Sequence, residues 1–443
     1  MQLPEHVAGV MAVLKGHGCA AYLVGGCVRD LLLGREPSDY DVVTEASPEV
    51  ICSLFPRTVA LGARYGTIVV VTPGGGVEVS TWKSRYHSPL PGLTSIEADL
   101  FWRDFTINAM AMDESGVIID PFGGLQDLQG RTIASPAHQA AQRFRDDPLR
   151  MVRAIRLGCT LDFALHPKVT DAIIAEAPLL ARVAVERIRC ELDHILLSER
   201  SAQGIRALAA TGLLTYILPE LIPLLDFDQK SPRHDQDLFE HTMAVLAAAP
   251  PRLTVRLAAL LHDVGKPACF SVDQEGRAHF YNHHIEGSRL AFAILQRLKY
   301  DHRTTAVVIR LIYDHMSRFP QVREGSLKKL ISRVGEENLD DLFALQRADI
   351  LGSAAPGDTS RLDAMQKEFG RIRALRPPLH LRDLAIDGND LIALGFEPGP
   401  RIGQVLESLL DVVLEEPEMN QAGTLLEKAK ACLQGGNLQK MRG

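Results

Sequence analysis

The chain carries its strongest signal in Leu23-Val24-Gly25-Gly26-Cys27-Val28-Arg29-Asp30, followed by Ser38-Asp39-Tyr40-Asp41. Its glycines let backbone N–H groups come close to a triphosphate, as a phosphate-binding turn requires. Alternation along a strand would place Asp39 and Asp41 on the same face. Two carboxylates at close range repel each other unless a cation lies between them, and hard oxygen ligands suit Mg²⁺ that also holds substrate phosphates. The stretch therefore predicts nucleotidyl transfer from a nucleoside triphosphate with two metal ions.

Each part of this pattern has an ordinary explanation when it stands alone. An isolated Gly-Gly is usually a turn, and an isolated Asp-x-Asp usually lies in a solvated loop. Their combination at this spacing, followed by Val42-Val43, is what supports the prediction. Glu78 alternates with apolar residues in a predicted strand and could supply a third carboxylate, with a solvent-facing edge position as the alternative.

Composition and charge narrow the class of protein. The chain has 443 residues, which predicts two to four domains, and its 46% hydrophobic and 23% charged residues are typical of a soluble globular protein. Seven scattered cysteines without a Cys-x-x-Cys pair predict reduced thiols in a cytoplasmic protein. We expect no signal peptide and no membrane-spanning segment. The net charge of −7 argues against a nucleic-acid coat protein but leaves room for a local RNA-binding surface.

The chain changes character after Asp120-Pro121-Phe122-Gly123-Gly124. Before this point, helical spacing predicts a helix that contains residues 7–14, and apolar runs predict strands, whereas from about His138 onward helical periodicity dominates to the end. The sequence therefore predicts an α+β protein with a mixed-sheet head and an all-helical remainder. The predicted strands are 21–25, 40–44, 67–71, 76–81 and 117–120.

Two further motifs carry charge patterns suited to a nucleotide. Arg103 can pair with a phosphate through its guanidinium fork, and Asp104 can accept a hydrogen bond from a ribose hydroxyl. Asp147, Arg150 and Arg153 follow one another at i, i+3 spacing, and an acceptor beside a planar group with five donors can read the edge of a base. Both motifs could also be ordinary surface ion pairs. A similar set at 186–191 is expected to begin a helix that buttresses this one.

In combination these motifs resemble the class II tRNA nucleotidyltransferases, the family of CCA-adding enzymes and bacterial poly(A) polymerases. The motifs lie in the first 160 or so residues, and beyond them the resemblance rests on helical character. The matching residues are Gly25-Gly26-Cys27-Val28-Arg29-Asp30, Asp39-Tyr40-Asp41, Arg103-Asp104-Phe105-Thr106-Ile107-Asn108-Ala109, Asp120-Pro121-Phe122-Gly123-Gly124, and Asp147-Pro148-Leu149-Arg150 with Arg153 and Arg156.

The resemblance implies roles for the matching residues. Mg²⁺ would bind to Asp39 and Asp41, and protein side chains would replace a nucleic-acid template. The helical body and tail would hold tRNA through its shape and phosphates. Gly25 and Gly26 with Arg29 would hold the triphosphate, Arg103 and Asp104 would contact the nucleotide phosphate and ribose, Asp147 and Arg150 would pair with the incoming base, and Arg153 and Arg156 would support phosphate and helix positioning.

Within the family, nucleotide choice stays open. Residues 61–68 look like the CCA-adding version, which argues against a poly(A) polymerase. The link 82–94 is shorter than the flexible stretch of full CCA-adding enzymes and resembles that of enzymes that add only two cytidines. Trp102 stands where the family has arginine, and Asp146 stands where it has glutamate.

The helical part carries a second set of candidate metal ligands. A histidine next to an aspartate on a helix can enter one metal's coordination shell together with a histidine from an earlier helix. The pattern resembles the HD phosphohydrolase superfamily, which implies a divalent transition metal and hydrolysis of phosphomonoesters or 2′,3′-cyclic phosphodiesters. An inactive HD fold that serves as a scaffold is the alternative. The implied ligands are His241, His262, Asp263 and Asp349, with His283 or His284 and His315 nearby.

The sequence as a whole predicts a tRNA 3′-end nucleotidyltransferase that adds CMP from CTP, either as CC or, with ATP, as the full CCA. The alternatives are an HD-type phosphohydrolase with a vestigial RNA-binding head, a poly(A) polymerase, and a non-catalytic RNA-binding protein. The predicted parts are a nucleotidyltransferase head at 1–137, a helical neck with the base-selecting motif at 138–222, an HD-type body at 223–375 and a tRNA-binding tail at 376–443.

Overall fold

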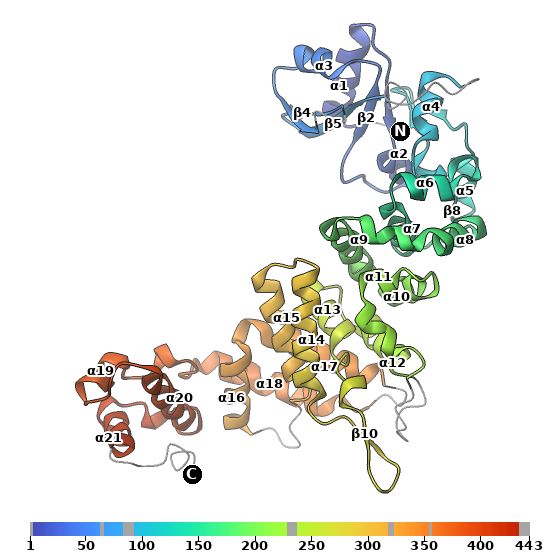
Figure 1. Ribbon diagram of the computed structural model, residues 1–443. Coiled ribbons are helices and arrows are strands. Elements are labelled where there is room, and N and C mark those ends of the chain that lie inside the picture. The colour runs from blue at the N-terminus through green and yellow to red at the C-terminus, as the bar shows by residue number, and fades with distance from the viewer. Residues whose placement is uncertain are drawn as a thin grey trace. The chain divides into compact units, whose positions relative to one another are not determined.

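The computed structural model describes residues 3–62, 66–82, 93–227, 237–317, 323–353 and 357–433. The chain divides into two compact units, Met1–Pro219 and Glu220–Gly443, each with its own buried core (Figure 1). Within the described ranges, no helix combines the length and the apolar character needed to cross a lipid bilayer.

A seven-stranded mixed sheet forms the start of the first unit, in the order β3-β4-β5-β2-β1-β6-β7. The central strand β2 runs antiparallel to β1 and parallel to β5. The mixed sheet confirms the predicted fold class. Its strands are β1 (Ala21–Val24), β2 (Asp41–Thr44), β3 (Thr58–Gly62), β4 (Thr67–Thr72), β5 (Gly75–Thr81), β6 (Ala111–Met112) and β7 (Ile118–Ile119).

Helices cover this sheet and fix the turns that carry the motifs. The predicted first helix is confirmed as α1 (Glu5–Gly16), which buries an apolar stripe at helical spacing. Helix α4 (Ser95–Phe101) begins with a capping box formed by Thr94 and Glu97, and it packs Leu100 into a core that includes Val24 and Val43. The other head helices are α2 (Gly26–Leu32), α3 (Pro48–Leu54) and α5 (Gly124–Gln129).

After the sheet, the first unit continues with helices. It also contains one short strand at 164–165, where the sequence predicted helices only. Residue Asp162 ends α7 in the left-handed conformation, and the chain then runs parallel to β8 (Thr132–Ile133) as β9 (Ala164–Leu165). Such two-residue strands leave no periodic signal in a sequence. The helices are α6 (Ala140–Asp146), α7 (Leu149–Leu161), α8 (Pro167–Glu176), α9 (Val185–Leu197), α10 (Ser201–Ala210) and α11 (Leu214–Ile217).

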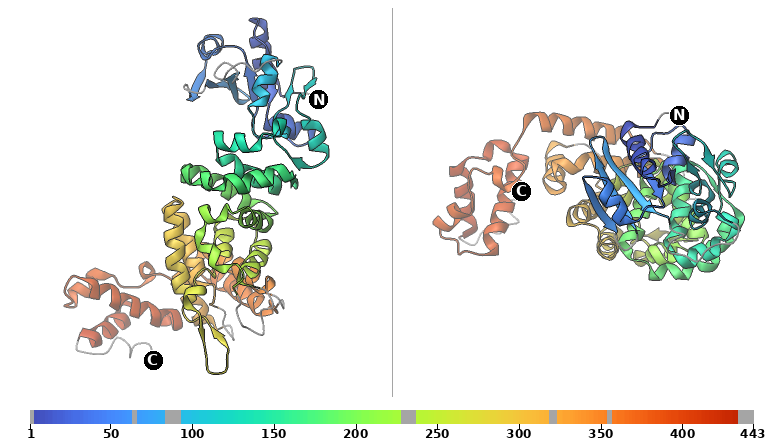
Figure 2. Two further views of the ribbon diagram at one scale, coloured as in Figure 1. Left: turned by 45° about the vertical axis from the view of Figure 1, so that its right-hand side comes forward. Right: turned by 90° about the horizontal axis from the view of Figure 1, so that it is seen from above.

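The second unit is helical except for one hairpin, which again was not predicted. Strands β10 (Ser271–Val272) and β11 (Ala278–His279) pair through a turn in which the Asp273 carboxylate accepts backbone N–H groups and Gly276 has a φ of 79°. Figure 2 shows this hairpin projecting from the helices. The helices are α12 (Leu238–Ala248), α13 (Leu253–Leu261), α14 (His283–Arg297), α15 (His302–Asp314), α16 (Glu324–Val334), α17 (Leu339–Leu351), α18 (Ser360–Leu375), α19 (Gly388–Ala393), α20 (Pro400–Glu415) and α21 (Ala422–Leu433).

Candidate functional sites

The glycine turn after β1 brings three predicted site residues together. Gly25 has a φ of 80°, a conformation that L side chains rarely adopt. A Cβ atom at this position would lie 2.9 Å from the Arg103 guanidinium and 3.5 Å from the Asp41 carboxylate. The turn therefore needs glycine for its backbone and for space, and Asp41 and Arg103 converge on it.

The carboxylates occupy the end of β2 and the strand beside it. Asp41 is the first residue of β2 and stands in register with Glu78 on the parallel strand β5, so both side chains lie on one face of the sheet. The strand begins only at Asp41, and Asp39 lies in the preceding bend, where its Oδ1 accepts the Ser38 hydroxyl at 3.0 Å. Strand alternation therefore does not apply to Asp39, and its place in the metal site stays a prediction.

The two arginines of the predicted phosphate site are each held by a carboxylate. Arg29 donates two hydrogen bonds of 2.9 Å to Asp30 and one of 2.8 Å to the Asn108 side chain. Arg103 donates to Asp99, one turn earlier, at 3.2 Å. These contacts restrict both guanidinium groups to positions beside the glycine turn and helix α2. Sequence reasoning quoted Asn108 within a motif but assigned it no role.

Asp104 belongs to a buried polar network and not to an open surface. Its carboxylate accepts hydrogen bonds from Asn108 at 3.0 Å and from Arg153 at 3.3 Å. Burial by itself raises the pKa of Asp104, but the Arg153 charge and the Asn108 hydrogen bond hold the pKa below its ordinary value. Glu191 of α9 also binds Arg153, at 3.2 Å, and Arg156, at 2.6 Å. The network thus ties the Arg103-Asp104 segment to α7 and α9.

The two residues of the predicted base-reading pair, Asp147 and Arg150, each bind a different partner in the structure. Asp147 lies between α6 and α7, where its carboxylate accepts hydrogen bonds of 2.9 and 3.3 Å from Arg187. Arg150 donates to the backbone carbonyl of Trp102 at 3.2 Å. Sequence reasoning expected a helix at 186–191, which α9 confirms, but it did not assign Arg187 to the site.

Six predicted residues of the second unit form a cluster in which all but the partly exposed Asp349 are buried. The Asp263 carboxylate lies 3.1 Å from His262 Nε2, 3.4 Å from His241 Nε2 and 3.5 Å from His283 Nε2. Asp349 lies 3.3 Å from His241, and the Nε2 atoms of His283 and His315 are 3.4 Å apart. Five of the six residues, all except His262, help to line a cavity of about 930 Å³. The six residues are His241 of α12, His262 and Asp263 after α13, His283 at the start of α14, His315 after α15 and Asp349 of α17.

Backbone contacts orient three of these imidazoles. The Nδ1 atoms of His262, His283 and His315 lie 2.9, 2.8 and 2.6 Å from the carbonyl oxygen three residues earlier. Because a carbonyl only accepts, Nδ1 carries the proton and Nε2 keeps its lone pair, as a metal ligand requires. Burial lowers the pKa of His315 to about 3, so this ring is neutral.

The ligand atoms fall into two groups that share Asp263. One group joins it to His241 and His262 and the other to His283 and His315, with all ligand atoms of each group within 4.8 Å. These donors suit a divalent cation. His284 is in neither group within the described part of the chain, and its ring packs against Tyr313 at 5.5 Å.

One side chain beside this cluster was not predicted. Lys266 places its Nζ 2.8 Å from Asp263. The sequence signal for this contact is that Lys266 follows Asp263 at i, i+3 spacing.

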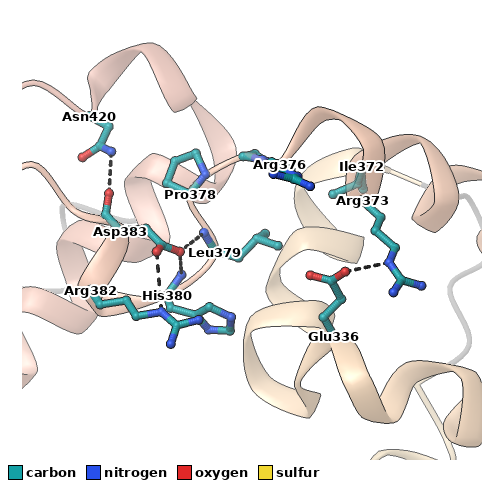
Figure 3. A pocket seen from close by; sticks show the side chains of 11 residues that line it. Glu336, Ile372, Arg373, Arg376, Pro378, Leu379, His380, Arg382, Asp383 and Asn420 are labelled. Carbon is teal, nitrogen blue, oxygen red and sulfur yellow. Dashed lines mark hydrogen bonds and ion pairs between the residues drawn. The ribbon is translucent and has the colours of Figure 1, made fainter.

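A basic cavity of about 660 Å³ also lies in the second unit, where α18 ends (Figure 3). Arg373 is paired with Glu336 at 2.8 Å, whereas Arg376 forms no ion pair within the described ranges. Arg382 lies 3.7 Å from Asp383, whose carboxylate is already bound to two backbone N–H groups. Positive charge therefore exceeds negative charge around this cavity.

Two segments bear on the choice between CTP and ATP, and both lie partly outside the described residues. Residues 63–65 of the 61–68 motif and residues 83–92 of the short link lie outside the described residues. What they imply about CTP and ATP stays a prediction.

Comparison with known proteins gives consistent matches along the chain. The poly A polymerase head domain model matches residues 21–134, a model described as a probable RNA and SrmB-binding site of polymerase A matches 162–225, and the HD domain model matches 238–352. The CCA-adding enzyme of Limosilactobacillus reuteri is 32% identical over 98% of this chain and 99% of its own length. That of Geobacillus stearothermophilus is 45% identical over 220 residues, so that alignment spans 48% of this chain and about half, 54%, of that relative.

A solved structure supports the same relationship. The crystal structure of the Bacillus stearothermophilus CCA-adding enzyme in complex with CTP is 29% identical, with a TM-score of 0.73 over 98% of this chain and all of the other.

Proposed function

Because the chain belongs to the family of CCA-adding enzymes, we propose that it is a tRNA 3′-end nucleotidyltransferase. It transfers CMP from CTP to the terminal hydroxyl of tRNA and releases pyrophosphate, without a nucleic-acid template. The observation that carries this proposal is the convergence of Asp41 and Arg103 on the Gly25 turn, with Glu78 in register beside Asp41. The compartment we propose is the cytoplasm, in line with seven free cysteines.

The residues of the head serve mainly to position and neutralise charge. Asp39, Asp41 and Glu78 would hold Mg²⁺, which when bound offsets the charge of the triphosphate and of the reacting α-phosphate. Gly25 lets the Arg103 and Asp41 side chains come close to the turn, and Arg103 brings a positive charge to the place proposed for the phosphates. Holding the nucleotide against the tRNA terminus lowers the entropic part of the barrier.

The neck would provide the base-reading groups. Asp147 and Arg150 line one cavity, as side chains that replace a template must. In the structure Asp147 is bound by Arg187, so in this proposal the base competes with Arg187 for that carboxylate. Arg153 and Arg156 act indirectly, because both are held by Glu191.

Primer extension tests the proposal. Purified protein is given tRNA transcripts that end at the discriminator base or at CC, with Mg²⁺ and with CTP and ATP supplied separately and together. Two added cytidines followed by a halt would establish CC addition, which the short link favours, and a completed CCA end would establish full addition. Failure to extend either transcript would overturn the proposal.

A second candidate function belongs to the second unit. We propose metal-dependent hydrolysis of phosphomonoesters or 2′,3′-cyclic phosphodiesters there, on the observation that buried Nε2 atoms and the carboxylates of Asp263 and Asp349 face one another. A divalent transition metal, when bound, would supply an activated water. Lys266, beside Asp263, places a positive charge where a substrate phosphate would be held.

The test uses 2′,3′-cyclic AMP and p-nitrophenyl phosphate with Mn²⁺, Co²⁺ or Ni²⁺. Hydrolysis should be lost in His262→Gln and kept in Asp41→Asn. If the native chain hydrolyses neither compound with any of these metals, the cluster is a scaffold and this second function is wrong.

We also propose that the basic cavity at the end of α18 binds tRNA phosphates. Arg376 forms no ion pair in the described part of the chain, and Arg382, which lies 3.7 Å from Asp383, has a largely exposed side chain that can reach a phosphate. Sequence-independent phosphate contacts of this kind provide affinity and register for RNA.

A further inference from the structure

A cavity of about 590 Å³ in the first unit lies beside the turn between α6 and α7. It contains the proposed base-reading pair, but one of its largest side chains has no role in that proposal. That side chain is Arg143 of α6. The lining residues are Trp102, Gln139, Gln142, Arg143, Asp146, Asp147 and Arg150.

Arg143 is buried in a way that fixes its guanidinium group. Only 1% of the residue is exposed, and the guanidinium carbon lies 4.5 Å from the centre of the Phe101 ring and 4.6 Å from that of Trp102. Its NH1 group donates to Asp146 at 3.2 Å. Two aromatic faces and one carboxylate therefore hold a cation at the wall of the cavity.

This arrangement leaves hydrogen-bond donors without acceptors. Within the described residues, Nε and NH2 of Arg143 and NH1 of Arg150 are buried and have no hydrogen-bond partner. An unsatisfied buried donor is costly, most of all on a charged group. A ligand that brings acceptor atoms into the cavity would relieve this cost.

We propose that Arg143 is a specificity-determining residue that donates, together with Arg150, to the base of the bound nucleotide and favours cytosine over adenine. This inference rests on the proposed nucleotidyl transfer. Cytosine presents two neighbouring acceptors, O2 and N3, on its pairing edge, which suit guanidinium donors. Adenine presents one acceptor, N1, beside the N6 amino donor, so it would leave more of these donors unsatisfied.

Two neighbours of Arg143 are residues at which the resemblance indicates a departure from the family pattern. Trp102 and Asp146, two residues that the resemblance marks as departures, both contact Arg143. The two changes therefore act on one side chain beside the base-reading pair.

Two substitutions test the role of Arg143. Arg143→Lys keeps the charge but loses the fork of donors, and Arg143→Met keeps most of the volume and the apolar contacts. The matched control is Arg145→Lys, whose parent side chain is exposed and paired with Glu176 away from the cavity. Initial rates with CTP and with ATP give KM and kcat, calorimetry gives the affinities for the two nucleotides without turnover, and thermal unfolding reports on the fold.

We expect both Arg143 variants to bind CTP about tenfold more weakly and ATP within about twofold of the native affinity, because one fork of charge-assisted bonds to a base gives discrimination of this order. The KM for CTP should rise more than kcat falls. Equal changes for the two nucleotides, or a lower melting temperature with unchanged affinities, would overturn the inference and show a structural role. A native protein that extends no tRNA would instead overturn the proposed function, while the ratio of CTP to ATP affinity would still decide the role of Arg143.

Discussion

Asp41 is the single residue on which the chemistry of the head depends most. It stands in register with Glu78 and beside the Gly25 turn, so its loss removes negative charge from the centre of the site. We expect Asp41→Asn to lower kcat for CMP incorporation by at least about 10³-fold, while the melting temperature changes little. Glu45→Gln, at an exposed position in the bend just after β2, is the control and should keep full activity. An active Asp41→Asn would exclude this carboxylate from the site.

The reactivity of the Cys27 thiol toward alkylating reagents should depend on pH. Burial raises the pKa of this thiol to about 11, and its Sγ lies 3.2 Å from the Val24 carbonyl oxygen. Because the pKa is raised, the reactive thiolate is scarce at pH 8, and its population grows about tenfold per pH unit only while the pH stays well below the pKa. In timed alkylation with mass spectrometry, Cys52 and Cys190, which are exposed, should react first. Equal labelling of Cys27 at pH 8 would show that the β1 turn opens.

Single residues also show where sequence reasoning ends. The residue types and spacing predicted that Gly25 and Asp41 share a site, and the resemblance to the class II tRNA nucleotidyltransferases added Arg103 to it. Arg187 was not predicted, although it binds Asp147 at 2.9 Å. Spacing along one helix cannot show which side chain of a helix forty residues later reaches it, since that depends on packing.

Among the elements, α7 and α9 are joined by charges as well as by apolar contacts. Glu191 accepts hydrogen bonds from Arg153 and Arg156, whose side chains are 39% and 24% exposed. Glu191→Gln should lower the free energy of unfolding by about 1–2 kcal/mol, less than for a fully buried pair because solvent screens both arginines. Urea unfolding measures this, with exposed Glu199→Gln as the control. No difference between the two variants would mean that apolar packing alone holds α7 against α9.

The end of α18 is the element whose charges we assign to tRNA. Arg376→Gln with Arg382→Gln should raise the KM for tRNA several-fold and leave the KM for CTP unchanged. The slope of log affinity against log salt should fall by roughly 1.5, since two phosphate contacts are lost. Arg361→Gln, at the other end of α18 and outside the cavity, is the control. An unchanged salt slope would remove this cavity from the tRNA-binding surface.

Long periodic elements were predictable and short ones were not. The stripe Val7, Val10, Met11 and Leu14 predicted α1 because four apolar side chains repeat at helical spacing. The hairpin β10–β11 has two residues per strand and depends on the Asp273 turn. Strands this short show no alternating pattern from which the hairpin could be predicted. Strand β2 begins at Asp41, one residue after its predicted start, and Asp39 lies outside it, so strand alternation does not determine how Asp39 is oriented relative to Asp41.

At the scale of the whole molecule, the two proposed chemistries belong to different compact units, Met1–Pro219 and Glu220–Gly443. A ligand stabilises only the unit that binds it, by about 2.7 kcal/mol at a hundred times its dissociation constant. In differential scanning calorimetry, CTP with Mg²⁺ should therefore raise the first unit's transition, and Mn²⁺ alone should raise the second unit's transition more than the first.

The variant His315→Gln distinguishes the metal site of the second unit from the CTP site of the first unit in the same experiment. Because the pKa of His315 is about 3, the ring is neutral, and the substitution removes a candidate ligand without removing a charge. The Mn²⁺ shift should shrink, while CMP incorporation and the CTP shift stay as in the native chain, because the groups that we assign to CTP all lie before Pro219. If His315→Gln instead abolished CMP incorporation, or if both ligands shifted a single transition equally, the two units would be one cooperative system, and the histidine–aspartate cluster would have to be treated as part of nucleotidyl transfer.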